Sequence, residues 1–268
     1  MYDSKHPYSR KVEGTLETIE KITRDDIVAF HKKYFHPNNI ILGISGDFNK
    51  EQIIKELNSV FAEWKKEDIN FPEVPKVENS FEKSVYYVYK DINQANVLMG
   101  HLGIHRRSPD YFPVMIMNFI LGGGSFTARI PGRIRSDEGL AYSAYSAFQT
   151  SRDIGVFFVS CQTKLESTHR AISIALEELD KIRKTQIDKE ELAQAKETFM
   201  NQFVFRFTTS ASIAGQKVDI EYEGLPLDYL ETYLSNVQSV TQEDVQRVAR
   251  KYLHPDEIKI LVVGNKEK

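Results

Sequence analysis

The stretch TRDDIVAFHKKYFHPNNIILGISG, residues 23–46, recurs without a gap as TQEDVQRVARKYLHPDEIKILVVG, residues 241–264, at an offset of 218. Eight matching positions are identical: Thr23/Thr241, Asp26/Asp244, Lys33/Lys251, Tyr34/Tyr252, His36/His254, Pro37/Pro255, Ile40/Ile258 and Gly46/Gly264. Only 22 residues precede the first copy, whereas more than 190 separate the two. The pattern predicts a tandem repeat whose first unit has lost most of its own beginning.

Each copy predicts a helix followed by a strand. The threonine supplies a side-chain oxygen as a cap, and the first turn is acidic. Each helix stops at His-Pro, because proline disfavours helical geometry in the residue before it. The short β-branched runs Ile40–Ile44 and Ile258–Val263 then predict strands. A second apolar-faced helix over residues 50–64 closes the first unit.

Residues 65–80 combine charge with two prolines and little periodicity, which is typical of a linker. The sequence after this linker predicts a domain in which strands come first and helices afterwards. The expected strands are residues 83–90, 94–103, 141–148 and 155–163, and the expected helices are 109–121, 167–184, 188–208 and 210–236. The fold class is therefore α+β: tandem homologous units, each a mainly antiparallel sheet covered by helices on one face. The domains are a truncated first unit at 1–64, a linker at 65–80 and a complete second unit at 81–268.

Composition excludes several classes of function. With 41% hydrophobic and 27% charged residues, the 268-residue chain is globular rather than disordered. A net charge of −3 provides no field that would attract nucleic acid. No apolar run approaches the ~20 residues of a membrane span, and the polar start of the chain predicts no signal peptide. The single cysteine, Cys161, is expected to be a buried structural thiol.

The segment LGGGSFTARIPGRIRSDEGLAYSAYSAF, residues 121–148, carries the most chemical information. Gly122, Gly123 and Gly124 predict a turn or a close approach by another backbone, with contact to a peptide or partner as the alternative. A phosphate-binding loop is disfavoured, because the glycines lack a Gly-Lys-Ser/Thr ending and a strand before them. Three arginines follow on an expected helix interrupted by Pro131-Gly132, and each could simply be solvated: Arg129, Arg133 and Arg135.

The run from Arg135 to Tyr142, RSDEGLAY, with LGGGSFTAR before it, resembles the second, non-catalytic domain of the pitrilysin and insulin-degrading-enzyme family of zinc peptidases, the inverzincins. His6-Pro-Tyr-Ser, the helix that begins at Thr23 and Gly46-Asp47-Phe48 resemble the closing half of that family's catalytic domain. The similarity covers essentially the whole chain. It also accounts for the repeat, because such enzymes consist of tandem homologous domains facing each other around a closed peptide chamber.

The resemblance implies zinc held by a His-x-x-Glu-His helix and a downstream glutamate, but none of the seven histidines here starts that motif. His101 and His105 have the spacing of a metal pair on a helix. They lie at the end of an expected strand, however, and no glutamate stands between them, so a structural role is expected. We therefore expect no metal site and no peptidase activity in this chain alone. Zinc is expected in a full-length parent, with its ligands upstream of Met1.

The resemblance also implies a substrate site. In the family an arginine and a tyrosine seven residues apart reach across the chamber toward the substrate, and Arg135 and Tyr142 fit that spacing. A guanidinium and a phenol are donors that can hold a carbonyl or stabilise an oxyanion. Gly139 is expected to end the helix of Arg135 and to turn the strand of Tyr142 back toward it.

Further substrate contacts are expected from Gln94 and Asn96, on a strand that the family uses near its peptide-binding edge. Alternation places both side chains on the same side of that strand, where they could steer a peptide adding to a sheet edge, although a solvated face is the competing interpretation. Three aromatic residues of the glycine-rich segment are expected in the core rather than at the substrate: Phe126, Tyr145 and Phe148.

Three interpretations of function remain open. In the first, the chain is the C-terminal part of a zinc metalloendopeptidase and binds a peptide or unfolded protein together with the missing N-terminal half or a homologous subunit. In the second, it is a non-catalytic peptide-binding or structural subunit that resembles the inactive subunit of processing peptidase. The third is a nucleotide-binding module at residues 122–125. The strand Ile40–Ile44 would lack its partners, and such an unpaired edge could join two copies in a homodimer.

Overall fold

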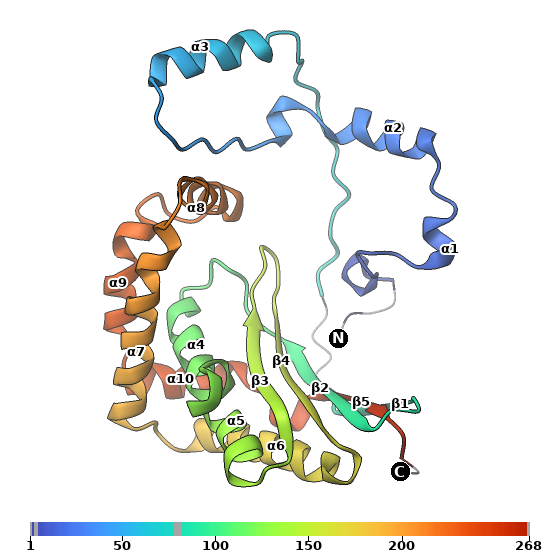
Figure 1. Ribbon diagram of the computed structural model, residues 1–268, viewed down its shortest axis with the longest axis vertical. Helices are drawn as coiled ribbons and strands as arrows, with labels where there is room; N and C mark the ends of the chain where they lie inside the picture. Colours follow the sequence, from blue (N-terminus) through green and yellow to red (C-terminus); the bar gives the residue numbers. More distant parts are fainter. Residues whose placement is uncertain (1, 3–4, 78–81, 267–268) are drawn as a thin grey trace. The chain divides into compact units, whose positions relative to one another are not determined.

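The computed structural model describes residues 2, 5–77 and 82–266 (Figure 1). The chain divides into two compact units, one of residues 79–205 and 223–268 and the other of residues 2–78 and 206–222. We call them the sheet unit and the helical unit. This division differs from the one expected from the sequence, which kept residues 81–268 in one uninterrupted domain, because residues 206–222 group with the helical unit.

The sheet unit contains a five-stranded sheet in the order β1-β5-β2-β4-β3. Its strands are β1 (Ser84–Tyr89), β2 (Gln94–Leu102), β3 (Ala141–Gln149), β4 (Val156–Lys164) and β5 (Lys259–Gly264). Only β1 and β5 are parallel, and the other neighbours are antiparallel. The prediction of an α+β fold with a mainly antiparallel sheet is confirmed.

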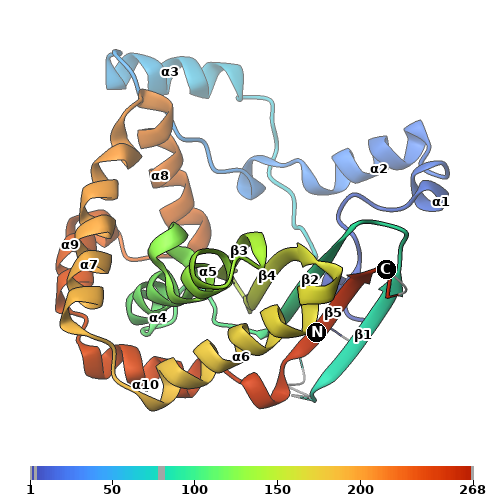
Figure 2. The same ribbon diagram turned by 60° about the horizontal axis from the view of Figure 1, so that its bottom comes forward.

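Helices cover one face of this sheet (Figure 2). On β2, Ala95, Val97 and Met99 are buried, whereas the side chains between them are exposed, so one face of the strand is covered and the other is open. The helices are α4 (Tyr111–Asn118), α5 (Arg129–Pro131), α6 (Thr168–Lys184), α7 (Lys189–Phe203), α9 (Tyr229–Ser239) and α10 (Gln242–Tyr252). Two π-helical segments, Phe119–Gly123 and Gly132–Asp137, follow α4 and α5. Short 3₁₀ turns occur at Ser125–Thr127, Leu165–Ser167, Val204–Phe207 and Pro255–Glu257.

Between the sheet and its helices lies the hydrophobic core. Phe157 of β4 is fully buried, and Ile174, Leu179 and Ile182 of α6 pack on the same side with no exposed surface. Cys161 of β4 is buried too, and burial raises the pKa of its thiol to about 11, so the thiolate is disfavoured. This residue is structural, as expected.

A buried carboxylate ties α10 to the start of α4. Asp110 accepts hydrogen bonds from Arg247 Nη1 at 2.7 Å, Lys251 Nζ at 2.9 Å and the Tyr252 hydroxyl at 2.6 Å. Burial by itself raises the pKa of Asp110, but the bonds from Tyr252, Lys251 and Arg247 outweigh it and hold the pKa at about 2. Within the sheet unit, the lysine-tyrosine pair of the second repeat copy, together with Arg247, therefore joins α10 to the start of α4.

The helical unit contains α1 (Leu16–Ile19), α2 (Arg24–Tyr34), α3 (Lys50–Val60) and α8 (Ser210–Glu223), with 3₁₀ turns at Pro7–Ser9 and Pro37–Asn39. The expected strand at Ile40–Ile44 does not form, and that prediction is wrong. Extended backbone becomes a strand only beside a partner, and no strand exists among the described residues of this unit. The segment instead packs on α8, where a Cβ at Gly43 would lie 2.5 Å from Val218 Cγ2.

Within the described residues, none of the helices combines the length and hydropathy of a membrane-crossing segment.

Candidate functional site

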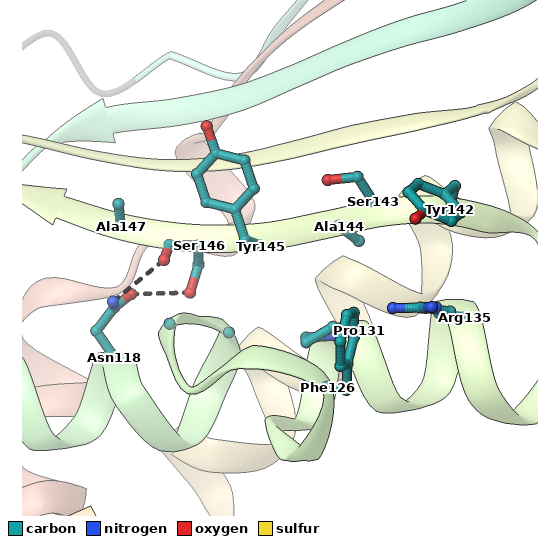
Figure 3. A pocket seen from close by; sticks show the side chains of 12 residues that line it. Asn118, Phe126, Pro131, Arg135, Tyr142, Ser143, Ala144, Tyr145, Ser146 and Ala147 are labelled. Atoms are coloured by element: carbon teal, nitrogen blue, oxygen red, sulfur yellow. Dashed lines mark hydrogen bonds between the residues drawn. The ribbon is translucent and has the colours of Figure 1, made fainter. Parts of the chain in front are cut away.

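A groove of about 590 Å³ lies between β3 and residues 122–124, which follow α4 and are called the glycine turn below (Figure 3). The groove lies entirely within the sheet unit. One wall is β3 from Tyr142 to Ala147. The other consists of the turn and of the helical segments after it, and supplies Asn118, Gly122, Gly123, Phe126, Pro131 and Arg135.

The glycine turn is pressed against its neighbours. A Cβ at Gly122 would lie 2.7 Å from the backbone nitrogen of Ser146, and one at Gly124 would lie 2.6 Å from the carbonyl oxygen of Phe119. Neither glycine has a positive φ, so small size is what these positions require. The expected close approach by another backbone is confirmed, and it accounts for Gly122 and Gly124 without a bound phosphate.

Two buried polar side chains hold the turn on β3. The Asn118 amide nitrogen donates to the Ser146 carbonyl at 3.2 Å, and the Ser146 hydroxyl donates to Asn118 Oδ1 at 2.8 Å (Figure 3). This pair was not among the residues expected from the sequence. The available signal was one polar residue inside the otherwise apolar run VMIMNFIL. Because a buried amide is costly unless it is hydrogen-bonded, such a residue predicts a specific partner.

Arg135 differs from the two other arginines of the segment. Arg129 makes two bonds to Glu191, at 2.8 and 2.6 Å, and Arg133 reaches Glu177 and Glu178 at 2.8 Å each. The Arg135 guanidinium instead stacks on Phe126, 3.8 Å from the ring centroid. Its Nη1 is buried and has no hydrogen-bond partner in the described part of the chain. Arg135 lines the groove, and the described residues leave this donor without an acceptor.

Tyr142 lies beside this arginine, with its ring centroid 5.1 Å from Arg135 Cζ and 82% of its surface exposed. Gly139 brings the two together. It has a φ of +61°, and the amide after it, on Leu140, donates to the Ile134 carbonyl at 2.8 Å, so the chain reverses from helix to strand. The expected role of Gly139 in joining the two elements is confirmed.

Replacing Gly139 with alanine is expected to cost about 1–2 kcal/mol of unfolding free energy, because an L-residue is strained at that φ. Urea unfolding of the chain measures this. Gly132→Ala is the matched control: Gly132 has a helical φ of −55°, and its Cβ would meet the nearest atom at 3.7 Å. Equal stability of the two variants would contradict the strain argument.

Two aromatic residues expected in the core line the groove instead. Phe126 and Tyr145 are exposed and face it, whereas Phe148 is buried as expected. β3 is the last strand of the sheet and Tyr145 points to its open side, while Phe126 lies on the turn beyond the strand edge. A short apolar pattern does not distinguish these positions from core positions.

Gln94 and Asn96 lie on the same exposed side of β2, as the alternation predicts. β2 lies between β5 and β4 and its backbone is already hydrogen-bonded, so a peptide that adds to a sheet edge would not pair with β2 itself. Neither residue lines the groove. The open edge of the sheet on this side belongs to β3.

The residues present do not fit a zinc ion. In residues 2, 5–77 and 82–266, no three histidine, cysteine, aspartate or glutamate side chains converge as a metal site would require. His101 is buried, with Nδ1 2.8 Å from the Leu102 carbonyl and Nε2 accepting from the His254 amide at 3.2 Å. Burial lowers the pKa of His101 to about 4, so it is neutral. His105 is exposed and does not converge with it.

Comparison with known proteins gives consistent matches. A family model described as "Peptidase M16 inactive domain" matches residues 21–199. A protein of Helicobacter pylori named "Non-peptidase homolog YmxG" is 28% identical over 98% of this chain and 60% of its own length. An uncharacterized zinc protease of Streptomyces coelicolor is 25% identical over 91% of this chain and 54% of its own length. The crystal structure of a peptidase M16 inactive domain from Pseudomonas fluorescens superposes with a TM-score of 0.90 at 27% identity, covering 99% of this chain and 63% of that one.

Proposed function

Because the chain belongs to the family of the peptidase M16 inactive domain, we propose that it supplies the substrate-binding half of a pitrilysin-type zinc metalloendopeptidase. The chain spans only about 60% of the length of the Helicobacter relative, so the activity belongs to a longer protein. Residues 1–64 would be the end of its catalytic-type domain, and the sheet unit would be the domain that faces the substrate. The ligand of the groove would be a peptide or an unfolded protein segment.

The observation that carries this proposal is the unpaired guanidinium nitrogen of Arg135 beside the exposed phenol of Tyr142. Two donors from adjacent elements converge on one groove. A substrate carbonyl placed there would accept from the Arg135 guanidinium, which is always charged, and from the Tyr142 hydroxyl. Because Nη1 is buried, this bond forms where water competes poorly, and it strengthens as negative charge develops on the oxygen.

The open edge of β3 supports an extended peptide as the ligand. β3 ends the sheet, and residues 142–147 of this strand line the groove. A peptide can add there as a further strand, with main-chain bonds supplying affinity. Gly122 and Gly123 would form the opposite wall at the end where the turn packs on Ser146, so an added strand would pair with the part of β3 nearer Tyr142. Gln94 and Asn96, which do not line the groove, could contact only more distant parts of a long substrate.

Zinc is proposed for the complete protein only. Since no described residues of this chain fit the ion, its ligands would lie in the remainder of the protein, and this chain would neither hold nor activate the attacking water. Its own contribution is to bind and orient the peptide and to place donors beside the reacting carbonyl.

A second candidate function is a non-catalytic peptide-binding or structural subunit. The name of the Helicobacter relative, a non-peptidase homolog, favours it. The two candidates differ in the complete gene product: bound zinc with peptide hydrolysis supports the first, and neither property with retained peptide binding supports the second.

Peptide binding by the 268-residue chain tests what both candidates share. Arg135→Ala is expected to raise the dissociation constant of a fluorescein-labelled unstructured peptide roughly 10- to 100-fold, as loss of a charge-assisted hydrogen bond does. Fluorescence anisotropy measures the effect. The control is Arg152→Ala, which removes an exposed arginine from the β3–β4 turn, outside the groove. If both variants bound the peptide like the unmodified chain, the groove would not be the binding site.

A further inference from the structure

β1, the outermost strand at the end of the sheet away from the groove, exposes apolar side chains on both of its faces (Figure 2). The consecutive residues from Val85 to Tyr89 are between 43% and 65% exposed. The cover of helices ends at β5: Met99 of β2, Ile260 of β5 and Val85 of β1 lie opposite one another, and they are 1%, 4% and 65% exposed. Because an apolar edge strand is normally covered or protected by charges, β1 has the composition of an interaction site.

The pairing of β1 with β5 shows which main-chain groups are left at the open edge. The Lys90 N–H donates to the Gly264 carbonyl at 3.0 Å, so the even-numbered residues of β1 direct their N–H and C=O groups toward β5. Because successive residues of a strand alternate, Val85, Tyr87 and Tyr89 direct theirs away from the sheet. These outward groups have no hydrogen-bond partner among the described residues. The edge can therefore pair with one more strand.

A cavity of about 330 Å³ opens beside β1, within the sheet unit. Val85 and Tyr87 line it together with Leu165, which precedes α6. The Tyr87 side chain is held in place by its hydroxyl, which donates to the Gly264 carbonyl at 2.8 Å and accepts from the Lys266 N–H at 3.1 Å. Where a strand adds to a sheet edge, main-chain bonds supply affinity and such cavities receive alternate side chains. The cavity thus favours a strand that brings an aromatic or aliphatic side chain to Val85.

We propose that β1 pairs antiparallel with β1 of a second copy of this chain, with the two Tyr87 residues opposite each other on a twofold axis. In this register every outward residue meets an outward residue, because Val85 of each copy lies opposite Tyr89 of the other. A shift of one residue would oppose outward groups to groups that already bind β5. A shift of two residues would leave one outward residue of each strand without an opposite strand residue.

Charge and side-chain size favour a second copy over an unrelated extended peptide. Antiparallel strands bring the start of one strand to the end of the other, so the exposed Lys83 of each copy meets the exposed Asp91 of its partner copy. Directly opposite residues share a face, so each Tyr89 ring lies over Val85 at the mouth of the cavity. Each contact then occurs twice, as in other twofold interfaces.

This contact is independent of the other surfaces discussed above. It uses no residue of the groove, so it does not depend on what Arg135 and Tyr142 bind. It also differs from the homodimer expected at Ile40–Ile44, where no strand forms.

Analytical ultracentrifugation of the 268-residue chain tests the proposal. The chain is expected to pass from monomer to dimer between about 1 and 100 μM. Val85→Pro is expected to weaken dimerisation at least ~10-fold, because proline has no N–H to donate across the edge, while the bonds to β5 come from even-numbered residues and remain. Val85→Thr is the matched control: it keeps the N–H and the β-branched shape, and should dimerise within about threefold of the unmodified chain. Thermal unfolding at the lowest concentration shows whether both variants are folded.

Disulfide cross-linking tests the register. Tyr87→Cys is expected to link two copies under mild oxidation, because opposite residues of a hydrogen-bonded pair have Cα atoms about 5.5 Å apart. Tyr86→Cys is the control and should not link, since Tyr86 lies opposite Val88 of the other copy. The native Cys161 is buried and does not compete. The proposal is overturned by a chain that stays monomeric over this range, by a dimer that folded Val85→Pro still forms, or by linking of Tyr86→Cys but not of Tyr87→Cys.

Discussion

Replacing Arg135 with alanine in the complete gene product is expected to lower peptide hydrolysis roughly 10²- to 10³-fold, as removal of one well-placed oxyanion donor does. The environment of the Arg135 guanidinium in the groove explains this expectation. Nη1 is buried without a hydrogen-bond partner among the described residues, so the free chain already bears the cost of desolvating this donor and a substrate carbonyl would relieve it. The gain would be greatest when that oxygen becomes negatively charged.

Steady-state kinetics with a quenched fluorescent peptide measure this effect, with zinc content determined on the same samples. Loss in kcat with unchanged KM would indicate a bond made only in the transition state, whereas a rise in KM alone would indicate simple substrate binding. Tyr142→Phe removes only the hydroxyl and should act in the same direction. Unchanged turnover in both variants, at full zinc content, would show that the pair has no catalytic role.

Asp110→Asn is expected to destabilise the 268-residue chain by about 2–3 kcal/mol at neutral pH. The folded-state pKa of about 2 lies well below the usual aspartate value, so the carboxylate stabilises the fold when it is ionised in both states. This contribution is fully present above about pH 5 and is lost as the pH falls through about 4 toward 2. The difference between the unmodified chain and the variant should therefore shrink over that range.

Urea unfolding at a series of pH values checks both the size and the sign. Asp137→Asn changes an exposed carboxylate of the same unit and serves as the control, with an expected effect within about 0.5 kcal/mol. A difference between the unmodified chain and Asp110→Asn that stayed constant from pH 7 to pH 2 would show that the side chain acts through packing rather than through its charge.

The ends of the helices and one tight turn could be predicted from residues that are close together in the sequence. Thr23 and Thr241 both form capping boxes with the aspartate three residues later, because cap and first turn lie within one short segment. Both helices end at a tyrosine two residues before His-Pro, which agrees with the disfavoured helical geometry of the residue before proline. Gly139 has the positive φ that its place between helix and strand predicts.

Predictions that depend on a distant partner were less successful. Ile40–Ile44 has the β-branched pattern of a strand, but pairing is supplied by other segments, and no strand forms there. The alternation on β2 correctly placed Gln94 and Asn96 on one side, yet it carries no information on whether the strand lies at the edge or in the middle of a sheet. That order depends on β5, which comes from the far end of the chain.

In the candidate site, too, the partners of single side chains could not be predicted from the sequence. Arg129, Arg133 and Arg135 lie within seven residues, and their sequence does not distinguish them. Glutamates of α6 and α7 bind the first two, whereas no carboxylate among the described residues reaches the third.

The sequence alone determined the repeat, the residues that begin and end its helices, and the family resemblance. That resemblance in turn pointed to the two residues proposed to bind substrate. Each of these features lies in short contiguous segments of the chain. Strand order, the groove, the buried Asp110 cluster and the contrast between the two repeat copies required the tertiary structure. The physical reason is that burial and pairing are properties of contacts between segments. Lys251 and Tyr252 bind the Asp110 carboxylate, whereas the similarly arranged Lys33 and Tyr34 have no carboxylate partner among the described residues.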